Sequence, residues 1–361
     1  MPHLFEPLRL RDARLRNRVA MSPMCTYSAE DGRADDWHLV HLGARATGGV
    51  GLVVVEATAV EARGRISPAD LGLWRDDQVD GLRRVTDFVR SQGGASAVQL
   101  AHAGRKASTH RPWAPRQGAV ADEDGGWPVV GPTSEPFSPR LRAPTALDAD
   151  GIARVVTAFA DAAARADAAG FDAVEIHAAH GYLIHQFLSP LVNTRDDGYG
   201  GGFEGRSRLL REVVRAVRAA LPEAKPLLLR ISASDWVEGG WSAEDSVRLA
   251  GELAGLGVDL VDCSSGGAVA GVQVPVAPGY QVPFAERVRR EAGVASGAVG
   301  RITTAAQADA IVREGKADLV LLGKALLDDP QWAIHAAREL RAAGDGEVAP
   351  PWPTQYGWVF R

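Results

Sequence analysis

The sequence predicts a closed (β/α)8 barrel, an α/β fold of the TIM-barrel type, with an insertion after the third strand and an extended C-terminal tail. Eight short runs rich in β-branched residues recur along the 361-residue chain, and a helical pattern follows each run. No G-x-G-x-x-G motif follows the first run, where an open dinucleotide-binding sheet usually carries one. We therefore treat residues 1–361 as a single barrel domain.

The eight expected strands are buried runs bounded by turn residues. The second, fifth and eighth are almost continuously apolar, as expected for parallel strands that are buried on both faces. In chain order, the eight cover residues 19–21, 50–56, 95–100, 171–177, 226–232, 258–264, 294–302 and 317–322.

Apolar periodicity and capping residues mark the helices. Apolar residues recur with the helical period of 3.6 before and after the fourth strand, at Ile152, Val155, Val156, Phe159, Ala163 and Ala166, and at Leu210, Val213, Val214, Val217 and Leu221. Ser242 with Asp245 predicts a capping box, Thr303 is expected to cap a helix that ends before Gly315, and Pro330 suits a first helical turn. The expected left-handed residues that stop helices are Gly93, Gly257 and Gly293.

Two segments break the strand–helix rhythm. Residues 104–145 are rich in proline and contain Trp113 and Trp127, and we expect them to form an insertion over the mouth of the barrel. Residues 344–361 have no helical period and contain several prolines and aromatic residues. A free tail is usually polar, so these aromatic side chains are expected to dock on a surface.

Composition excludes several classes of partner. The net charge is −5, from 40 basic and 45 acidic residues with no basic run, which argues against nucleic acid. Residues 1–18 do not resemble a signal peptide, and no stretch approaches transmembrane length, so we expect no membrane association. The two cysteines, Cys25 and Cys263, cannot form a disulfide framework, which favours a cytoplasmic location; Cys263 is expected in the core.

The residues at the carboxyl ends of barrel strands line the active site of this fold. At those positions the sequence places mostly polar, cationic and small residues, which are Ser22 to Tyr27, Glu56 to Thr58, Gln99 to His102, Arg105, Lys106, His177 to Tyr182, Arg230, Ser264 to Gly267, Gly300, Arg301, Gly323 and Lys324.

Two groups among these residues suggest a chemistry. Glycines beside Arg301 and Lys324, at the ends of the last two strands, are typical of a phosphate pocket, although Lys324 could simply cap a loop. His177 and His180 could hold a carbonyl or phenolate oxygen by two N–H donors, with Tyr182 placed to give a proton. Alternatively the histidines could be metal ligands, or buried core residues.

Arg230 ends an apolar strand and is expected to face an anionic group. The alternative is an internal ion pair, for example with Glu56 or Glu175.

Several long motifs resemble the Old Yellow Enzyme family, most closely the bacterial branch of xenobiotic reductases and thermophilic-like enzymes. The resemblance extends from Leu4 to about Trp352. Its motifs, in order, lie at residues 22–25 (SPMC), 56–60 (EATAV), 99–106 (QLAHAGRK), 175–183 (EIHAAHGYL), 187–190 (FLSP) and 262–266 (DCSSG).

The resemblance implies a barrel that binds FMN non-covalently and uses NAD(P)H to reduce activated alkenes such as cyclic enones. In the implied ping-pong cycle, flavin N5 gives hydride and Tyr182 gives the proton. His177 and His180 are implied to bind the substrate carbonyl, and Tyr27 to line that pocket. Cys25 is implied to tune the reduction potential of the flavin. The residues implied to hold the flavin ring are Ser22, Pro23, Met24, Cys25, Ala57, Gln99, His177 and Arg230. Those implied to hold its phosphate are Gly300, Arg301, Gly323 and Lys324.

Two positions depart from the family pattern. Lys324 stands where the family usually has arginine, and lysine lacks the bidentate fork. Gln355-Tyr356 is followed by Gly357-Trp358, as in the xenobiotic reductase tail, and this implies that Trp358 reaches the substrate pocket of a neighbouring subunit in a homodimer or homotetramer. The alternative is that the tail docks on its own barrel.

Two rival functions use the same residues. A metal-dependent barrel hydrolase would use His177 and His180 as ligands, and a non-catalytic barrel would only bind a phosphate ligand. The sequence does not specify the physiological substrate or a preference between NADH and NADPH.

Overall fold

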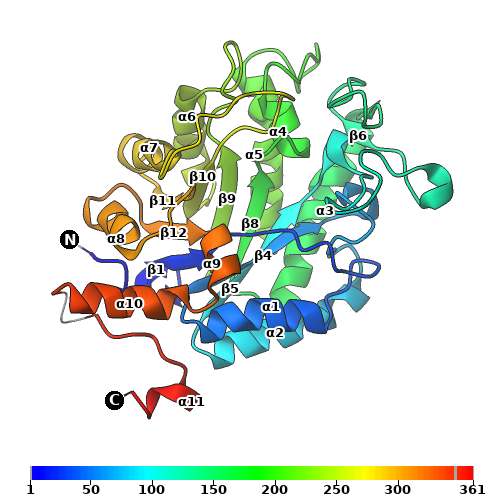
Figure 1. The fold of residues 1–361 in the computed structure, drawn as a ribbon. Helices are drawn as coiled ribbons and strands as arrows, with labels where there is room; N and C mark the ends of the chain where they lie inside the picture. Colours follow the sequence, from blue (N-terminus) through cyan, green and yellow to red (C-terminus); the bar gives the residue numbers. More distant parts are fainter. Residues whose placement is uncertain (1, 345–347, 361) are drawn as a thin grey trace.

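A closed barrel of eight parallel strands forms the centre of the computed structural model, which describes residues 2–344 and 348–360 (Figure 1). The strand order around the barrel is β10-β11-β12-β3-β4-β5-β8-β9, which confirms the predicted fold class. The strands are β3 (Val19–Met21), β4 (Leu52–Ala59), β5 (Ala95–Ala101), β8 (Ala173–Ala178), β9 (Leu227–Ser232), β10 (Leu260–Ser264), β11 (Ala295–Ala298) and β12 (Leu319–Leu322).

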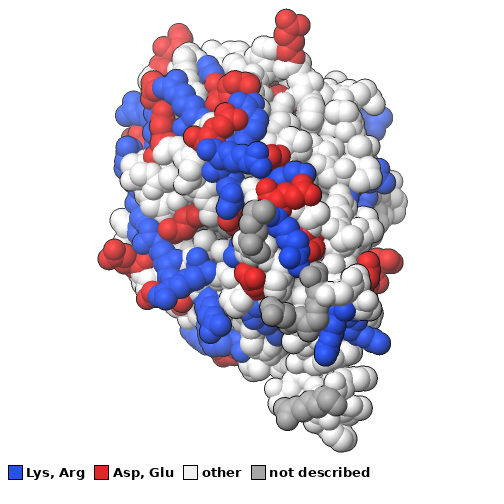
Figure 2. Space-filling view, turned by 90° about the vertical axis from the view of Figure 1, so that its left-hand side faces the viewer, with Lys and Arg blue, Asp and Glu red and all other residues white. Residues whose placement is uncertain are grey.

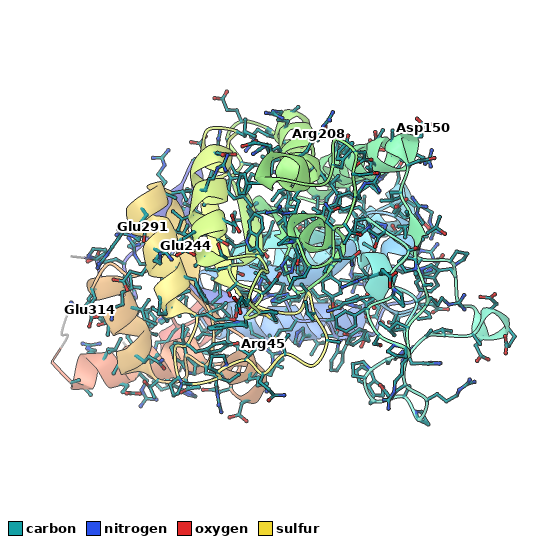
Figure 3. All side chains as sticks on the ribbon, turned by 90° about the horizontal axis from the view of Figure 1, so that it is seen from above. Arg45, Asp150, Arg208, Glu244, Glu291 and Glu314 are labelled. Carbon is teal, nitrogen blue, oxygen red and sulfur yellow. The ribbon has the colours of Figure 1, made fainter. Side chains whose placement is uncertain are left out.

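Helices cover the outside of the barrel. They are α1 (Asp36–Thr47), α2 (Val79–Ser91), α3 (Ala149–Ala168), α5 (Phe203–Ala220), α6 (Ala243–Ala254), α7 (Val282–Arg287, continued by a π-helical turn over Val288–Ala292), α8 (Ala305–Arg313) and α10 (Trp332–Ala342). The short helices α4 (Leu183–Leu188) and α9 (Lys324–Asp328) follow β8 and β12. Charged side chains such as Arg208, Glu244 and Glu291 are exposed on the outer faces of the helices (Figure 3).

The periodic apolar residues form the core between strands and helices. Ile152, Val155 and Phe159 of α3 are fully buried, as are Val213 and Val217 of α5. Loss of a buried phenylalanine side chain such as that of Phe159 typically costs about 3–5 kcal/mol. This packing holds the outer helices against the strands. It therefore also holds the strand ends, which carry the candidate site residues, in place.

The predicted capping signals are mostly confirmed. Ser242 and Asp245 form a capping box at the start of α6. The three expected stop residues have left-handed φ angles of 75°, 96° and 69°, at Gly93, Gly257 and Gly293. Thr304, not Thr303, caps α8, because its side chain accepts the N–H of Gln307. Pro330 precedes α10 instead of lying in its first turn, since the helix begins at Trp332.

A hairpin at the amino end of the barrel was not predicted. It consists of β1 (Leu8–Leu10) and β2 (Ala13–Leu15). Leu8, Leu10 and Leu15 pack with the interior side chains of the barrel strands. The hairpin therefore closes the end of the barrel that lies opposite the strand carboxyl ends.

The expected strand over residues 294–302 is shorter than predicted. β11 ends at Ala298, because Gly300 and Arg301 have φ angles of 116° and 50° and turn the backbone out of the sheet.

The insertion and the tail extend from the barrel in Figure 1. The insertion leaves β5 through a 3-10 turn (Gly104–Lys106) and contains β6 (Val130–Gly131), which pairs with β7 (Thr145–Ala146). The tail includes one helical turn, α11 (Thr354–Gly357), contrary to the expectation of none, because Pro353 O accepts the N–H groups of Tyr356 and Gly357. Residues 345–347 and 361 of the predicted tail lie outside the described residues.

One face of the molecule carries charges of both signs. Lysine and arginine are interspersed with aspartate and glutamate over the left-hand part of the view in Figure 2, and the right-hand part is mostly uncharged. Within residues 2–344 and 348–360, no helix combines the length and apolar character needed to cross a membrane.

Candidate active site

Two histidines and a tyrosine meet at the carboxyl end of β8. The rings of His177 and His180 are perpendicular, with centroids 5.1 Å apart, and the ring of Tyr182 lies 5.0 Å from that of His177. The N–H of Ala179 donates to Nδ1 of His177, so a neutral His177 carries its proton on Nε2. His180 Nε2 lies 2.7 Å from Oγ of Ser264 on β10. The predicted trio is therefore brought together in space.

Burial fixes the protonation of this trio. Burial lowers the pKa of His177 and of His180 well below the usual range, and the charge of Arg230 lowers both further. Burial also raises the pKa of the Tyr182 hydroxyl. At neutral pH the site thus presents neutral imidazoles and a protonated phenol. Such groups can stabilise a developing oxyanion and supply a proton.

A strained turn carries His180 and Tyr182. His180 has a φ of 57° and Gly181 a φ of 70°, so two successive residues are left-handed. A Cβ on Gly181 would lie 2.0 Å from the carbonyl oxygen of Gly267, so the close approach of two backbones requires glycine there. The turn thus brings the end of β8 against the loop after β10.

Lys106 holds these two loops together. Its Nζ donates to the carbonyl oxygens of His180 at 2.8 Å and Gly267 at 2.5 Å, and it lies 4.0 Å from the ring centroid of Phe137 in the insertion. Burial lowers the pKa of Lys106 to about 7. The sequence predicts Lys106 only as a residue near a strand end, without a role. The signal for its role is its position shortly after His102, at the end of the third strand.

The segment after β3 passes beside the same mouth. Tyr27 has a φ of 50°, and its ring contacts that of Trp113 edge to face at 5.7 Å, so the insertion reaches this side of the site. Cys25 is partly buried. Burial raises the pKa of its thiol, and the nearby Glu56 raises it further, so the sulfur is a neutral thiol and not a reactive thiolate.

A buried carboxyl group supports that segment. Glu56 accepts the N–H of Thr26 at 2.8 Å and its hydroxyl at 2.5 Å. Burial raises the pKa of Glu56 to about 7. The folded protein therefore binds a proton at Glu56 more tightly than the unfolded chain does.

We expect the pKa of Glu56 to make stability depend on pH. Because the folded pKa is raised, the free energy of unfolding is highest below about pH 4.5 and falls as the pH rises to about 7, by about 3 kcal/mol from this group. Glu56→Gln, which resembles the protonated acid, should remove this slope. Denaturant titrations of wild type and variant at pH 5, 6, 7 and 8 measure it; parallel curves would contradict the assignment.

A second polar cluster lies in the barrel below the mouth. Nε2 of Gln99 donates to Glu175 at 2.8 Å, and Nε of Arg230 lies 3.0 Å from Oδ2 of Asp262. The structure shows the alternative for Arg230, an internal ion pair, but its partner is Asp262 instead of Glu56 or Glu175, because the β9–β10 register places Asp262 directly opposite it. Burial raises the pKa of Glu175 to about 8, and the charge of Asp262 contributes.

The guanidinium of Arg230 can still donate hydrogen bonds to a further group. Among the described residues, the guanidinium nitrogens of Arg230 make no hydrogen bond, and the ion pair with Asp262 is made through Nε. An acceptor-rich ring system above Arg230 and Gln99 would satisfy them. Asp262 is an acidic residue inside the apolar run of the sixth strand, and that is the signal in the sequence for a buried ion-pair partner.

The predicted phosphate-binding residues lie at neighbouring strand ends. β11 pairs with β12, so Gly300 and Arg301 follow one strand while Gly323 and Lys324 follow the next. Both cationic side chains are exposed. β12 pairs in turn with β3, and the N–H of Ser22 donates to Leu322 O at 2.9 Å. The structure thus places the residues assigned to the phosphate beside those assigned to the flavin ring.

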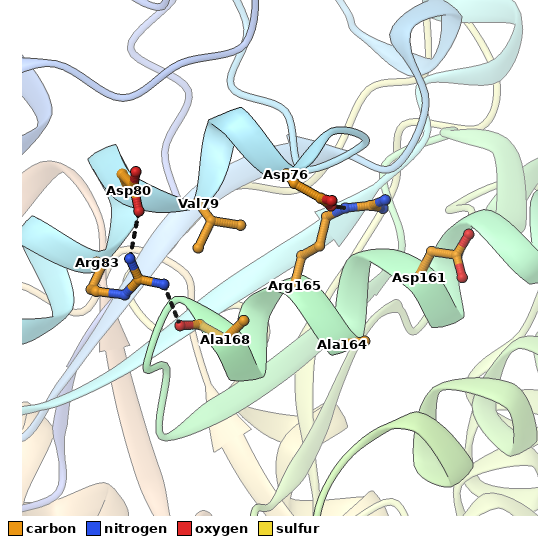
Figure 4. A pocket seen from close by; sticks show the side chains of 8 residues that line it. All are labelled: Asp76, Val79, Asp80, Arg83, Asp161, Ala164, Arg165 and Ala168. Carbon is orange, nitrogen blue, oxygen red and sulfur yellow. Dashed lines mark hydrogen bonds and ion pairs between the residues drawn. The ribbon is translucent and has the colours of Figure 1, made fainter.

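The groove between α2 and α3 does not compete with this site. It has a volume of about 500 Å³, but its charged side chains pair with one another, as Asp76 with Arg165 and Asp80 with Arg83 (Figure 4). No group of three or more His, Cys, Asp or Glu side chains within the described ranges could hold a metal ion.

Comparison with known proteins identifies the class to which this (β/α)8 barrel belongs, the barrel oxidoreductases that bind a flavin. Residues 3–342 match the model of the NADH:flavin oxidoreductase / NADH oxidase family. The chain is 48% identical over 361 residues to an NADPH dehydrogenase of Geobacillus sp. (strain WCH70), covering 99% of both chains. An NADPH dehydrogenase of Listeria monocytogenes serotype 4a is 45% identical over 363 residues, and 100% of both chains is covered.

Solved structures share the fold. Morphinone reductase superposes with a TM-score of 0.77 at 29% identity, over 92% of this chain and 88% of that one. The chain belongs to the NADH:flavin oxidoreductase / NADH oxidase family, the family of the Old Yellow Enzymes. It is therefore an NAD(P)H-dependent oxidoreductase with FMN as cofactor, and the hydrolase and phosphate-binding alternatives are set aside.

Proposed function

We propose that the enzyme reduces the activated C=C bond of α,β-unsaturated carbonyl compounds such as cyclic enones. The observation that carries the proposal is the meeting of His177, His180 and Tyr182 at the end of β8, with neutral imidazoles and a protonated phenol. Two N–H donors suit a carbonyl oxygen that gains negative charge, and each such donor is worth about 2.7–4 kcal/mol in comparable sites.

Each residue of the trio has a separate task. His177 and His180 bind the substrate oxygen, which withdraws electron density from the β-carbon. Tyr182 gives its proton to the α-carbon, and its raised pKa keeps that proton available at neutral pH. Tyr27 and Cys25 form the adjoining wall of the pocket.

The proposed FMN site uses the strand ends on the same rim. Ser22 to Cys25, Ala57, Gln99, His177 and Arg230 would hold the ring, and Gly300, Arg301, Gly323 and Lys324 the phosphate. FMN, when bound, supplies the hydride relay between NAD(P)H and the alkene. The free terminal nitrogens of Arg230 suit the electron-rich edge of the ring. Because the relatives from Geobacillus and Listeria are NADPH dehydrogenases, we propose NADPH as the preferred nucleotide.

Steady-state and anaerobic kinetics with purified holoenzyme test this function. We expect 2-cyclohexenone to reoxidise the NADPH-reduced enzyme, cyclohexanone to leave it reduced, and double-reciprocal plots to be parallel, as for a ping-pong cycle. NADPH and NADH are compared at equal concentration. Reoxidation by oxygen or quinones but by no enone would refute the proposed substrate class.

The aromatic tail is proposed to form part of a neighbouring subunit's site in a dimer or tetramer. Val348 and Pro353 are buried, whereas Trp358 is 71% exposed and Phe360 is 59% exposed. The ring of Trp352 stacks on Phe360 at 4.3 Å, which braces the tail without covering Trp358. An exposed indole of this size suits burial in an interface.

Removing residues 355–361 should weaken dimerisation and raise the KM for small cyclic enones several-fold, with FMN retained. Trp358→Ala should change substrate preference, and Trp358→Phe should do so less, because an aromatic wall remains. Analytical ultracentrifugation and a panel of enones of increasing size measure these effects. A truncated protein with unchanged association and substrate profile would show that the tail acts only on its own subunit.

A further inference from the structure

Every backbone polar group of the strained turn that carries His180 has a partner. The N–H of His180 donates to Oγ of Ser232, and its carbonyl accepts from Lys106. The carbonyl of Gly181 accepts from Nε2 of Gln186, and the N–H of Gly181 donates to Nδ1 of His185 at 2.9 Å. A left-handed conformation is costly for His180, although not for Gly181, so these contacts keep the turn in place.

The contact from Gly181 depends on one tautomer of His185. An N–H can donate to Nδ1 only when that nitrogen carries no proton, so neutral His185 must carry its proton on Nε2. The other tautomer, or the doubly protonated ring, would place two N–H groups against each other. His185 has no exposed surface.

Asp235, in the loop after β9, faces the other ring nitrogen of His185. Its Oδ1 lies 2.9 Å from Nε2 of His185, and both side chains are fully buried. Its Oδ2 accepts the hydroxyl of Ser189 at 2.6 Å and the N–H of Trp241 at 2.9 Å. Burial raises the pKa of Asp235, but the donors from His185, Ser189 and Trp241 outweigh it, and the net pKa lies below the usual value. The group is a buried carboxylate, which stabilises a proton on Nε2 of His185.

We propose that Asp235 and His185 are positioning residues, which hold the turn after β8 so that His180 and Tyr182 point into the site. The proposal rests on the proposed roles of His180 and Tyr182. The chain of contacts runs from the loop after β9, through His185 on α4, to the backbone of Gly181. Among the described residues, no hydrogen bond, ion pair or ring contact joins the side chain of Asp235 or His185 to His177, His180 or Tyr182, so the link runs through the backbone of Gly181.

Asp235→Asn is the sharpest variant because it preserves shape and changes only the proton preference. The amide can donate to Nε2 of His185, which favours a proton on Nδ1 and opposes the N–H of Gly181. In comparable orienting carboxylates, this exchange gives the wrong tautomer with little change in geometry. His185→Gln is the second variant, because its amide can accept from Gly181 and donate to Asp235 at the same time.

The test uses FMN-loaded enzyme with 15N-labelled histidine. The nitrogen shifts of His185, assigned by their loss in His185→Gln, should show Nε2–H in the wild type and Nδ1–H in Asp235→Asn. The affinity for 4-hydroxybenzaldehyde is titrated through the flavin absorption and should fall about tenfold in Asp235→Asn. The kcat/KM for 2-cyclohexenone should fall by the same factor. In His185→Gln both values should stay nearer to those of the wild type. Glu6→Gln, which alters the His3–Glu6 pair elsewhere on the chain, is the matched control.

The outcomes separate this proposal from the proposed function. If Asp235→Asn changes the tautomer of His185 but leaves the affinity for 4-hydroxybenzaldehyde unchanged, the positioning role is overturned. An unchanged tautomer in Asp235→Asn also overturns it. In either case His180→Ala still weakens binding if the proposed function is right. If His180→Ala itself leaves affinity and enone turnover unchanged, the proposed function fails. If Asp235→Asn does not fold, an equal loss of affinity in His185→Gln and in His185→Leu overturns the proposal, and a loss confined to His185→Leu supports it.

Discussion

Replacing both His177 and His180 by alanine is expected to slow enone reduction by at least about 100-fold while FMN stays bound. Each N–H donor of this kind is worth about 2.7–4 kcal/mol in the transition state, so even one lost contact gives a factor of this size. The flavin has other proposed contacts, from Gln99 and Arg230 to the residues after β3, so its retention is expected.

The measurement is kcat/KM for 2-cyclohexenone together with the flavin content of each preparation. His3→Ala combined with His335→Ala is the control, because it also removes two imidazoles but at positions outside the site. Affinity for 4-hydroxybenzaldehyde should fall in parallel in the active-site variant. Enone turnover equal to wild type in that variant would exclude the two histidines as the carbonyl donors.

The low pKa values of the two histidines extend this prediction to pH. Since burial keeps both rings neutral, donation to the carbonyl depends on their tautomers and not on imidazolium charge. His177 already has its tautomer determined by the N–H of Ala179. Affinity for a neutral enone should therefore stay constant from pH 6 to 8. A steep increase toward acid pH would mean that an imidazolium is the donor.

The sequence was sufficient to predict the barrel because its strands are buried on both faces and its helices bury one face. Those two patterns depend on local periodicity, which a single sequence shows directly. The β1–β2 hairpin could not be predicted in this way. Its strands span three residues each, and Arg9 and Arg14 interrupt their apolar character. Only its packing against the barrel interior makes it a stable element.

The candidate site was predictable to the extent that it depends on strand ends. His177, His180 and Tyr182 lie within six residues of one another in the chain, and they meet in the structure. The partner of Arg230 depends instead on strand register, which places Asp262 beside it and which the sequence does not show. The role of Lys106 depends on two loops that approach each other only in the closed barrel.

Tyr182→Phe is expected to slow alkene reduction by roughly 100-fold or more while reduction of the enzyme by NADPH changes little. General acid catalysis contributes about 10²–10⁴-fold, and only the alkene step needs a proton at carbon. The ring that remains keeps its contact with His177, so the carbonyl donors should stay in place. Stopped-flow traces of the two half-reactions measure the effect separately.

The size of the decrease in the rate of alkene reduction in Tyr182→Phe also indicates how the proton reaches the site. Tyr182 is only partly buried, so water that enters the mouth can replace the phenol and reduce the effect toward the lower end of that range. A solvent isotope effect on the alkene half-reaction should then differ between wild type and variant, because the proton comes from a different donor. Tyr199→Phe, which removes a hydroxyl bonded to Glu212 and not to the mouth, is the matched control. Equal slowing of both half-reactions in Tyr182→Phe would assign Tyr182 to binding or packing instead of proton transfer, since a lost proton donor cannot slow a step that consumes no proton.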